Sequence, residues 1–120
     1  MAFTTLTVAT VNSDGVTLAA PVAVDGTNGN QFTNDGRTKI EITNGSGSPI
    51  TATFVTYGSY TVGSKAYAIA DNAVTIAAGA TKGVGPFDKT LYNNPATGMV
   101  EVTFSSATTV TGRVTALGTS

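Results

Sequence analysis

Residues 39–54 read KIEITNGSGSPITATF, and this stretch decides the fold class. Apolar side chains fall at every second position on both sides of its centre, at 40 and 42 and again at 50, 52 and 54. A period of two is typical of strands that bury one face. The centre, Asn44–Pro49, has the composition of a turn. We therefore expect two short strands joined by a connection of hairpin length.

The same alternation recurs along most of the chain. It is clear in Val100–Phe104, in Val74–Ile76 and in Val110–Ala116, and it is weaker in Leu6–Val8 and Val16–Leu18. Many of the apolar residues in these runs are β-branched, which suits a pleated and half-buried surface. The pattern predicts further short strands over the whole length of the chain.

The connections between these runs are short and contain glycine. Asp14-Gly15 separates the two weaker runs, and Ala78-Gly79 leads from the strand at 74–76 to Lys82–Phe87. Glycine supplies the positive φ of tight hairpin turns, whereas parallel neighbours need long crossovers. Lys65–Ala73 is rich in alanine and fits a helical turn, an irregular connection or a strand. We predict an all-β fold, an antiparallel two-sheet sandwich, immunoglobulin-like or jelly-roll-like, of about seven to eight short strands.

The length of 120 residues predicts a single domain. Residues 1–30 have weaker periodicity and are expected to form N-terminal strands or an extended arm, with the β-sandwich over 31–120. The first residues, MAFTT, lack the basic and apolar regions of a signal peptide, and no apolar run has the length of a membrane span. We therefore expect synthesis in the cytoplasm and no membrane partner.

The composition argues against catalysis. The chain has no histidine and no cysteine, so the usual general base, thiolate nucleophile and transition-metal ligands are all missing. Its seven acids fall mainly in turns or on strand faces that the alternation places in water. One oxygen-rich group could suggest Ca²⁺, but its spacing is not that of an EF-hand and its composition is that of ordinary turns. That group is Asp25, Asn28, Asn30, Asn34 and Asp35. We predict no enzyme activity, no cofactor and no metal site.

The charge pattern argues against nucleic-acid binding. The net charge is −1, only 11% of residues are charged, and the six cations are scattered along the sequence. Phosphate recognition needs several clustered cations. The surface must instead be covered by Thr, Ser, Asn and Gly, which is unusual for a freely diffusing monomer and suits a protein held in an assembly.

Aromatic side chains are the candidate contact residues. Tyrosine occurs four times and tryptophan is absent. Tyr57 falls on the outward face of its run, and Tyr60 follows Gly58-Ser59, where we expect a loop. Tyrosines of this kind pack at the edge of a core, stack on sugars or anchor a protein contact, and packing at the edge is the favoured interpretation for each of them. Phe3, Tyr57 and Tyr60 are the residues that we predict to contact another protein.

Several segments between residues 29 and 116 resemble small virion-associated proteins of tailed phages. They are NQFTNDGRT at 30–38, IEITNGSGSPI at 40–50, VTIAAGATK at 74–82, GPF at 85–87, YN at 92–93 and GMVEVTF at 98–104. The resemblance implies a capsid decoration or cement protein, made in the host cytoplasm and located on the capsid exterior. It also implies the major capsid protein as partner and a homo-oligomer, with a trimer favoured.

Two classes of function follow from these observations. The leading hypothesis is a structural virion protein that binds the outer surface of a tailed-phage capsid and stabilises capsomer contacts, with many weak contacts repeated over a symmetric lattice. The alternatives are a carbohydrate-binding or adhesive β-sandwich module, which the absence of tryptophan weakens, and a tail or baseplate structural subunit.

Overall fold

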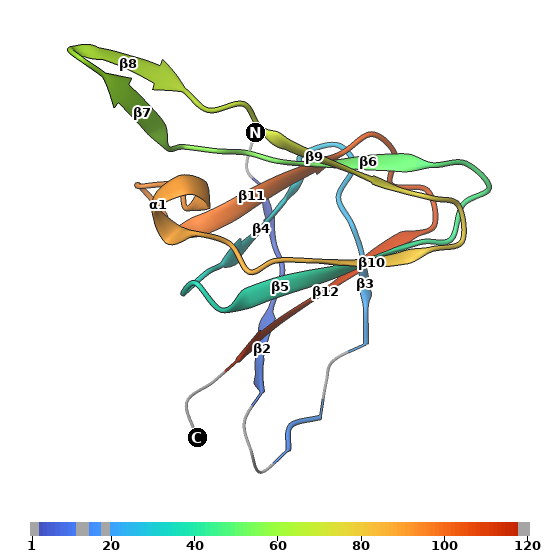
Figure 1. Ribbon diagram of the computed structural model, residues 1–120. Helices are drawn as coiled ribbons and strands as arrows, with labels where there is room; N and C mark the ends of the chain where they lie inside the picture. The colour runs from blue at the N-terminus through green and yellow to red at the C-terminus, as the bar shows by residue number, and fades with distance from the viewer. Residues whose placement is uncertain (1–2, 12–14, 18–19, 118–120) are drawn as a thin grey trace.

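The computed structural model describes residues 3–11, 15–17 and 20–117. Two five-stranded sheets pack face to face, and a separate two-stranded hairpin extends from one end of them (Figure 1). The first sheet has the order β1-β4-β11-β6-β9, and the second has the order β10-β5-β12-β2, with β3 also paired to β12. The predicted all-β class and the two-sheet packing are therefore confirmed.

The strands are short and of unequal length. The bounds in the first sheet are β1 Thr4–Thr5, β4 Asn30–Thr33, β11 Met99–Phe104, β6 Ile50–Phe54 and β9 Asn72–Ile76. Those in the second sheet are β10 Thr81–Val84, β5 Thr38–Asn44, β12 Val110–Leu117, β2 Val8–Val11 and β3 Val22–Ala23. The hairpin and the helix are β7 Ser59–Val62, β8 Lys65–Ala68 and α1 Lys89–Tyr92. No helix among the described residues has the length and apolar character needed to span a membrane.

Both sheets are mixed, so the strictly antiparallel sandwich of seven to eight strands is wrong. β1 pairs with β4 in parallel, and β2 pairs with β12 in parallel. Most of the chain separates β2 from β12, and this stretch supplies the long connection that a parallel pair requires. Turn signals report only on neighbours in the sequence, and for this reason they could not reveal these pairs.

The two short connections expected to close hairpins instead cross from one sheet to the other. β5 lies in the second sheet while β6 lies in the first, and β9 and β10 are divided in the same way. The connections at 45–49 and 77–80 are therefore arches between sheets. The expected pairing of Leu6–Val8 with Val16–Leu18 is also wrong, because β2 pairs with β12, residues 15–17 form no strand, and Leu18 lies outside the described residues.

The alternation correctly predicted which side chains form the core. Ile40, Ile42, Phe54, Val100 and Val102 are fully buried, as the period of two required. The other buried apolar residues are Leu6, Val24, Phe32, Ile50, Ala52, Ile76, Phe87, Phe104, Val110, Val114 and Ala116. The core therefore lies between the two sheets, where the central strands β4, β5, β6, β11 and β12 contribute most of its side chains.

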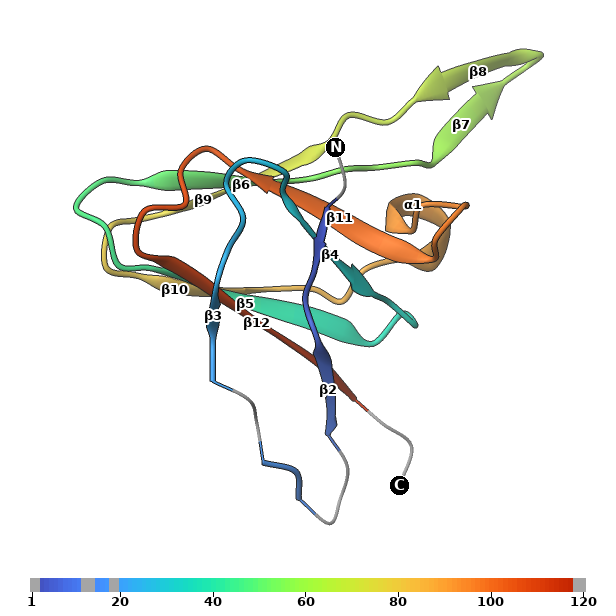
Figure 2. The same cartoon turned by 180° about the vertical axis from the view of Figure 1, so that it is seen from behind.

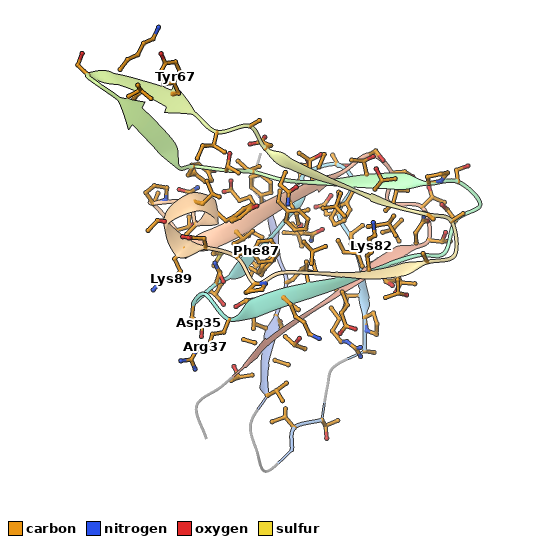
Figure 3. The ribbon with its side chains drawn as sticks, viewed as in Figure 1. Asp35, Arg37, Tyr67, Lys82, Phe87 and Lys89 are labelled. Carbon is orange, nitrogen blue, oxygen red and sulfur yellow. The ribbon has the colours of Figure 1, made fainter. Side chains whose placement is uncertain are left out.

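The edge strands β9 and β10 end the two sheets on the same side of the sandwich. Lys82 of β10 stands opposite the buried Ile42 in the strand register, and its ammonium group donates a hydrogen bond to the Thr75 carbonyl of β9 at 2.8 Å (Figure 3). A charged side chain at an open edge opposes pairing with strands of other molecules. Lys82 therefore opposes pairing with other molecules at the edges of both sheets.

Candidate functional site

The β7–β8 hairpin projects from the two sheets and is the candidate contact surface. Figures 1 and 2 show it projecting away from the two sheets, and its strands pair only with each other. The two-residue turn is Gly63-Ser64, and Gly63 adopts a φ of +63°, a conformation that hairpin turns of this length require. Val62 is 62% exposed and Tyr67 is 40% exposed. The hairpin therefore presents large apolar side chains at a distance from the core.

The two segments that enter and leave the hairpin are held together at its base. The Thr56 hydroxyl donates to the Ile69 carbonyl at 2.6 Å, and the Thr56 amide donates to Asp71 Oδ1 at 3.0 Å. An isolated two-stranded hairpin is marginally stable in water. These hydrogen bonds stabilise the base of the hairpin and fix the direction in which it leaves the first sheet.

A second set of contacts joins the base to α1. The amides of Tyr57 and Gly58 both donate to the Leu91 carbonyl, at 2.7 and 3.1 Å. A Cβ atom at Gly58 would lie 2.8 Å from Leu91 Cδ1 and 3.2 Å from its Cα, so a larger residue would force Leu91 to shift and the close approach favours glycine. The backbone that starts the hairpin is thus packed directly on the helix.

Glu101 forms a buried polar cluster beneath this base. The carboxylate group is on the outer side of the first sheet, yet Glu101 is only 5% exposed. It accepts hydrogen bonds from the Tyr57 hydroxyl at Oε1 and from Asn94 Nδ2 at 3.0 Å at Oε2. The expectation that acids on strand faces lie in water is wrong here, because Tyr57 and the segment after α1 cover this part of the sheet.

Burial and the hydrogen bond to Glu101 raise the pKa of Tyr57 from 10.0 to about 12. Because the folded-state pKa lies above the unfolded value, the resulting stabilisation is complete below pH 10 and is lost as the pH rises through 12. A shift of this size corresponds to at most about 2.7 kcal/mol. Since 41% of Tyr57 is exposed, screening by solvent reduces the contribution to about 1 kcal/mol.

We therefore expect Tyr57→Phe to lower the free energy of unfolding by about 1 kcal/mol near neutral pH, and this difference should disappear between pH 10 and 12. Urea unfolding of both proteins at several pH values measures it. The two proteins differ only in the Tyr57 hydroxyl, so the comparison isolates its contribution. A difference that stays constant up to pH 12 would contradict this role.

The structure separates the three residues predicted to contact another protein. Tyr57 lies at the base of the hairpin and Tyr60 lies in β7, so the loop expected at Tyr60 is wrong; the Tyr60 side chain is outside what the structure describes. Phe3 is half-buried elsewhere, where a Cβ at Gly29 would lie 2.8 Å from its ring. Phe3 therefore packs against the loop that precedes β4.

The sequence left open whether the segment that contains β8 forms a strand. Lys65–Ala73 was compatible with a helical turn, an irregular connection or a strand, and the structure forms β8 in its first half and begins β9 at Asn72. The signal that could have found the hairpin is the turn dipeptide Gly63-Ser64, which has a tyrosine three positions away on each side, at Tyr60 and Tyr67. A two-residue connection with glycine is a strong local indication of a hairpin.

The five oxygen-rich residues do not converge on a common point. The Asp25 carboxylate accepts from the amides of Asn28 and Thr27, both at 2.9 Å, and from the Thr4 hydroxyl at 2.6 Å. These bonds, led by that from the Asn28 amide, lower the pKa of Asp25 to about 2. Asn34 belongs to a different loop and donates to the Phe87 carbonyl at 3.1 Å. Asp25 therefore organises a turn and fastens β1 to it.

One further observation concerns metal binding. Within the described residues, no group of three His, Cys, Asp or Glu side chains could hold a metal ion. The geometry instead provides a candidate contact surface, formed by Val62 and Tyr67 on the β7–β8 hairpin. No protein-family model, curated protein or solved structure matches the chain.

Proposed function

We propose that this protein is a structural component of a tailed-phage virion that binds the outer surface of the capsid and stabilises contacts between capsomers. The observation that carries the proposal is the projecting β7–β8 hairpin, on which Val62 is 62% exposed and Tyr67 is 40% exposed. The partner is the major capsid protein. The resemblance of residues 29–116 to small virion proteins is the reason for proposing a phage virion as the assembly.

Two properties of the molecule support this proposal. Exposed Val62 and Tyr67 stand on a hairpin whose base is clamped by Thr56 and by α1, so little conformational freedom is lost on binding. The net charge of −1 and the low charged fraction suit a protein that is held by many repeated contacts. A homo-oligomer, with a trimer favoured, would repeat the hairpin around one axis.

The direct test is co-sedimentation with emptied, expanded heads of the parent phage. We expect the protein to pellet with heads in a saturable manner and to remain in the supernatant without them. Failure to pellet at any concentration would overturn the proposal. Pelleting with separated tails alone would assign the protein to the tail or baseplate, and saturable binding to soluble polysaccharides would favour the adhesive alternative.

The hairpin can be tested with the double variant Val62→Ser, Tyr67→Ser. We expect binding to heads to weaken at least tenfold, because exposed apolar and aromatic side chains at the centre of a contact carry much of its energy. The free energy of unfolding should fall by about 1 kcal/mol or less, because Val62 is 62% exposed and the loss of the Tyr67 ring removes its contact with the Lys65 ammonium group, 5.4 Å from the ring centroid.

A matched control is Val22→Ser on β3, because Val22 is 52% exposed and lies on the second sheet, away from the hairpin. This control should bind heads as the unmodified protein does. Equal loss of binding in the control and in the double variant would show that the hairpin is not the contact.

A further inference from the structure

The outer face of the second sheet carries a pocket of about 480 Å³. We call it the second-sheet pocket; the lining residues that matter are Val11, Arg37, Lys39, Glu41, Pro86 and Thr115. Lys39 and Thr115 face each other across β5 and β12, and their neighbours Ile40 and Val114 are buried in the core. Because side chains alternate along a strand, Lys39 and Thr115 point away from the core. The pocket therefore opens on the side of the sandwich that faces away from the first sheet.

Thr115 at this pocket has an unusual environment. It is only 3% exposed, and its hydroxyl has no hydrogen-bond partner among the described residues. Buried polar groups are nearly always hydrogen-bonded, and leaving one without a partner is costly. Thr115 also lines the pocket, so a ligand that displaces the side chains covering this hydroxyl would supply the hydrogen bond that the described residues do not.

The rim of the pocket is positively charged. Glu41 forms an ion pair with Arg113 at 3.1 Å, so its charge is already compensated. Arg37 and Lys39 are exposed, and no carboxylate of the described residues lies within ion-pair distance of either (Figure 3 shows Arg37 extending outward). The walls between them are formed by Val11, Pro86 and the aliphatic parts of these side chains. The pocket thus combines an apolar interior with a rim that carries two cations without an ion pair among the described residues, although the Asp35 carboxylate accepts a hydrogen bond from the Arg37 amide at 2.9 Å.

We infer that the second-sheet pocket binds an extended segment of the major capsid protein. An apolar side chain of that segment lies inside the pocket, and one of its carboxylates lies at Arg37 and Lys39. The Thr115 hydroxyl hydrogen-bonds to a polar group of that segment. Charge complementarity favours this occupant over the hairpin of a second copy, because Lys65 is the only charged residue of that hairpin. The inference rests on the proposed function and adds a second contact, on the opposite sheet from the hairpin.

Thr115→Val gives the sharpest test because its two effects have opposite signs. Valine has nearly the same shape and lacks the hydroxyl, so the free protein should be equally or more stable. Binding to the emptied heads should nevertheless weaken about tenfold, since the segment loses its hydrogen bond. A role confined to the fold would leave binding unchanged.

The double variant Arg37→Gln, Lys39→Gln tests the charged rim. Binding should weaken about tenfold, and it should depend less on salt concentration than binding of the unmodified protein. Val22→Ser serves again as the control, because it alters an exposed side chain of the same sheet that does not line the pocket.

A photo-crosslinking amino acid at Gly83 identifies the occupant. A Cβ at this position meets nothing within 4 Å, and Gly83 faces Glu41 in the strand register at the rim. Irradiation of the complex with heads should join this position to an apolar and acidic segment of the major capsid protein. Crosslinks only to a second copy, with a matching larger species in sedimentation velocity of the free protein, would overturn the inference.

The outcomes separate the two proposals. If the unmodified protein stays in the supernatant, the proposed function fails and the inference fails with it. If the unmodified protein pellets and both pocket variants pellet equally well, the inference alone is wrong.

Discussion

Replacing Phe87 with alanine is expected to lower the free energy of unfolding by about 4 kcal/mol, the largest effect that we expect from one substitution. Phe87 is 2% exposed and follows edge strand β10, yet its ring lies between the two sheets (Figure 3). The ring centroid is 5.6 Å from that of Phe32, 5.1 Å from that of Phe54 and 5.2 Å from that of Tyr92. Alanine would leave a cavity where these rings meet.

Urea unfolding measures this change as a lower midpoint at an unchanged slope. The control is Phe87→Leu, which keeps most of the apolar volume and should cost less than half as much as Phe87→Ala. The total stability of a domain is about 5–15 kcal/mol, so Phe87→Ala removes a large share of it. A loss below about 1 kcal/mol would show that Phe87 does not connect the sheets in solution.

Replacing Asn44 with alanine is expected to cost about 3 kcal/mol, the second largest effect. Asn44 is fully buried at the end of β5, and its amide side chain is completely hydrogen-bonded. Its Nδ2 donates to the carbonyls of Ser48 at 2.8 Å and Ile76 at 3.1 Å. Its Oδ1 accepts from the Ser46 amide at 3.0 Å and from the Ser46 hydroxyl at 2.6 Å.

The backbone of Asn44 adds two more bonds to the same place. Its amide donates to the Ala80 carbonyl at 2.9 Å, and its carbonyl accepts from the Gly79 amide at 2.7 Å. Asn44 thus joins the arch at 45–49 to the arch at 77–80. Alanine would leave the Ile76 carbonyl without its side-chain donor in a buried site, and it would remove one of two side-chain donors from the carbonyl of exposed Ser48.

The matched control for Asn44→Ala is Ser46→Ala. It removes one hydroxyl from the same network but leaves Asn44 and its two donor bonds in place, so it should cost about 1 kcal/mol. Thermal unfolding of both variants provides the comparison. If Ser46→Ala were as damaging as Asn44→Ala, the bond between the arches would not be the important interaction.

Strand positions and the core were largely predictable from the sequence. The alternation at Ile40 and Ile42, or at Val100 and Val102, depends only on the two-residue period of a strand, and these side chains are fully buried. Phe87 was harder to predict, because it lies outside the alternating runs and reaches the core from a connection. The expectation that Glu101 lies in water was wrong, because its strand position faces outward and the alternation does not show that Tyr57 and the segment after α1 cover it.

The candidate binding surfaces were less predictable than the core. Tyr57 was singled out from its outward position, and the structure places it at the base of the hairpin, where its hydroxyl bonds to Glu101. Val62 and Tyr67 carry no special sequence signal, because an exposed apolar residue looks the same in a sequence as a buried one. The second-sheet pocket joins residues from both ends of the chain, such as Val11 and Thr115, which only the fold brings together.

The sequence that begins KIEIT and ends ITATF determined by itself that this chain forms short strands with one apolar face. It determined this because alternation is a local property that each strand expresses without its neighbours. Only the tertiary structure decided that the Asn44–Pro49 turn between those strands crosses from one sheet to the other. The same turn residues suit a hairpin and an arch, and the choice depends on which partner strand, near or distant in the sequence, completes each sheet and closes the core.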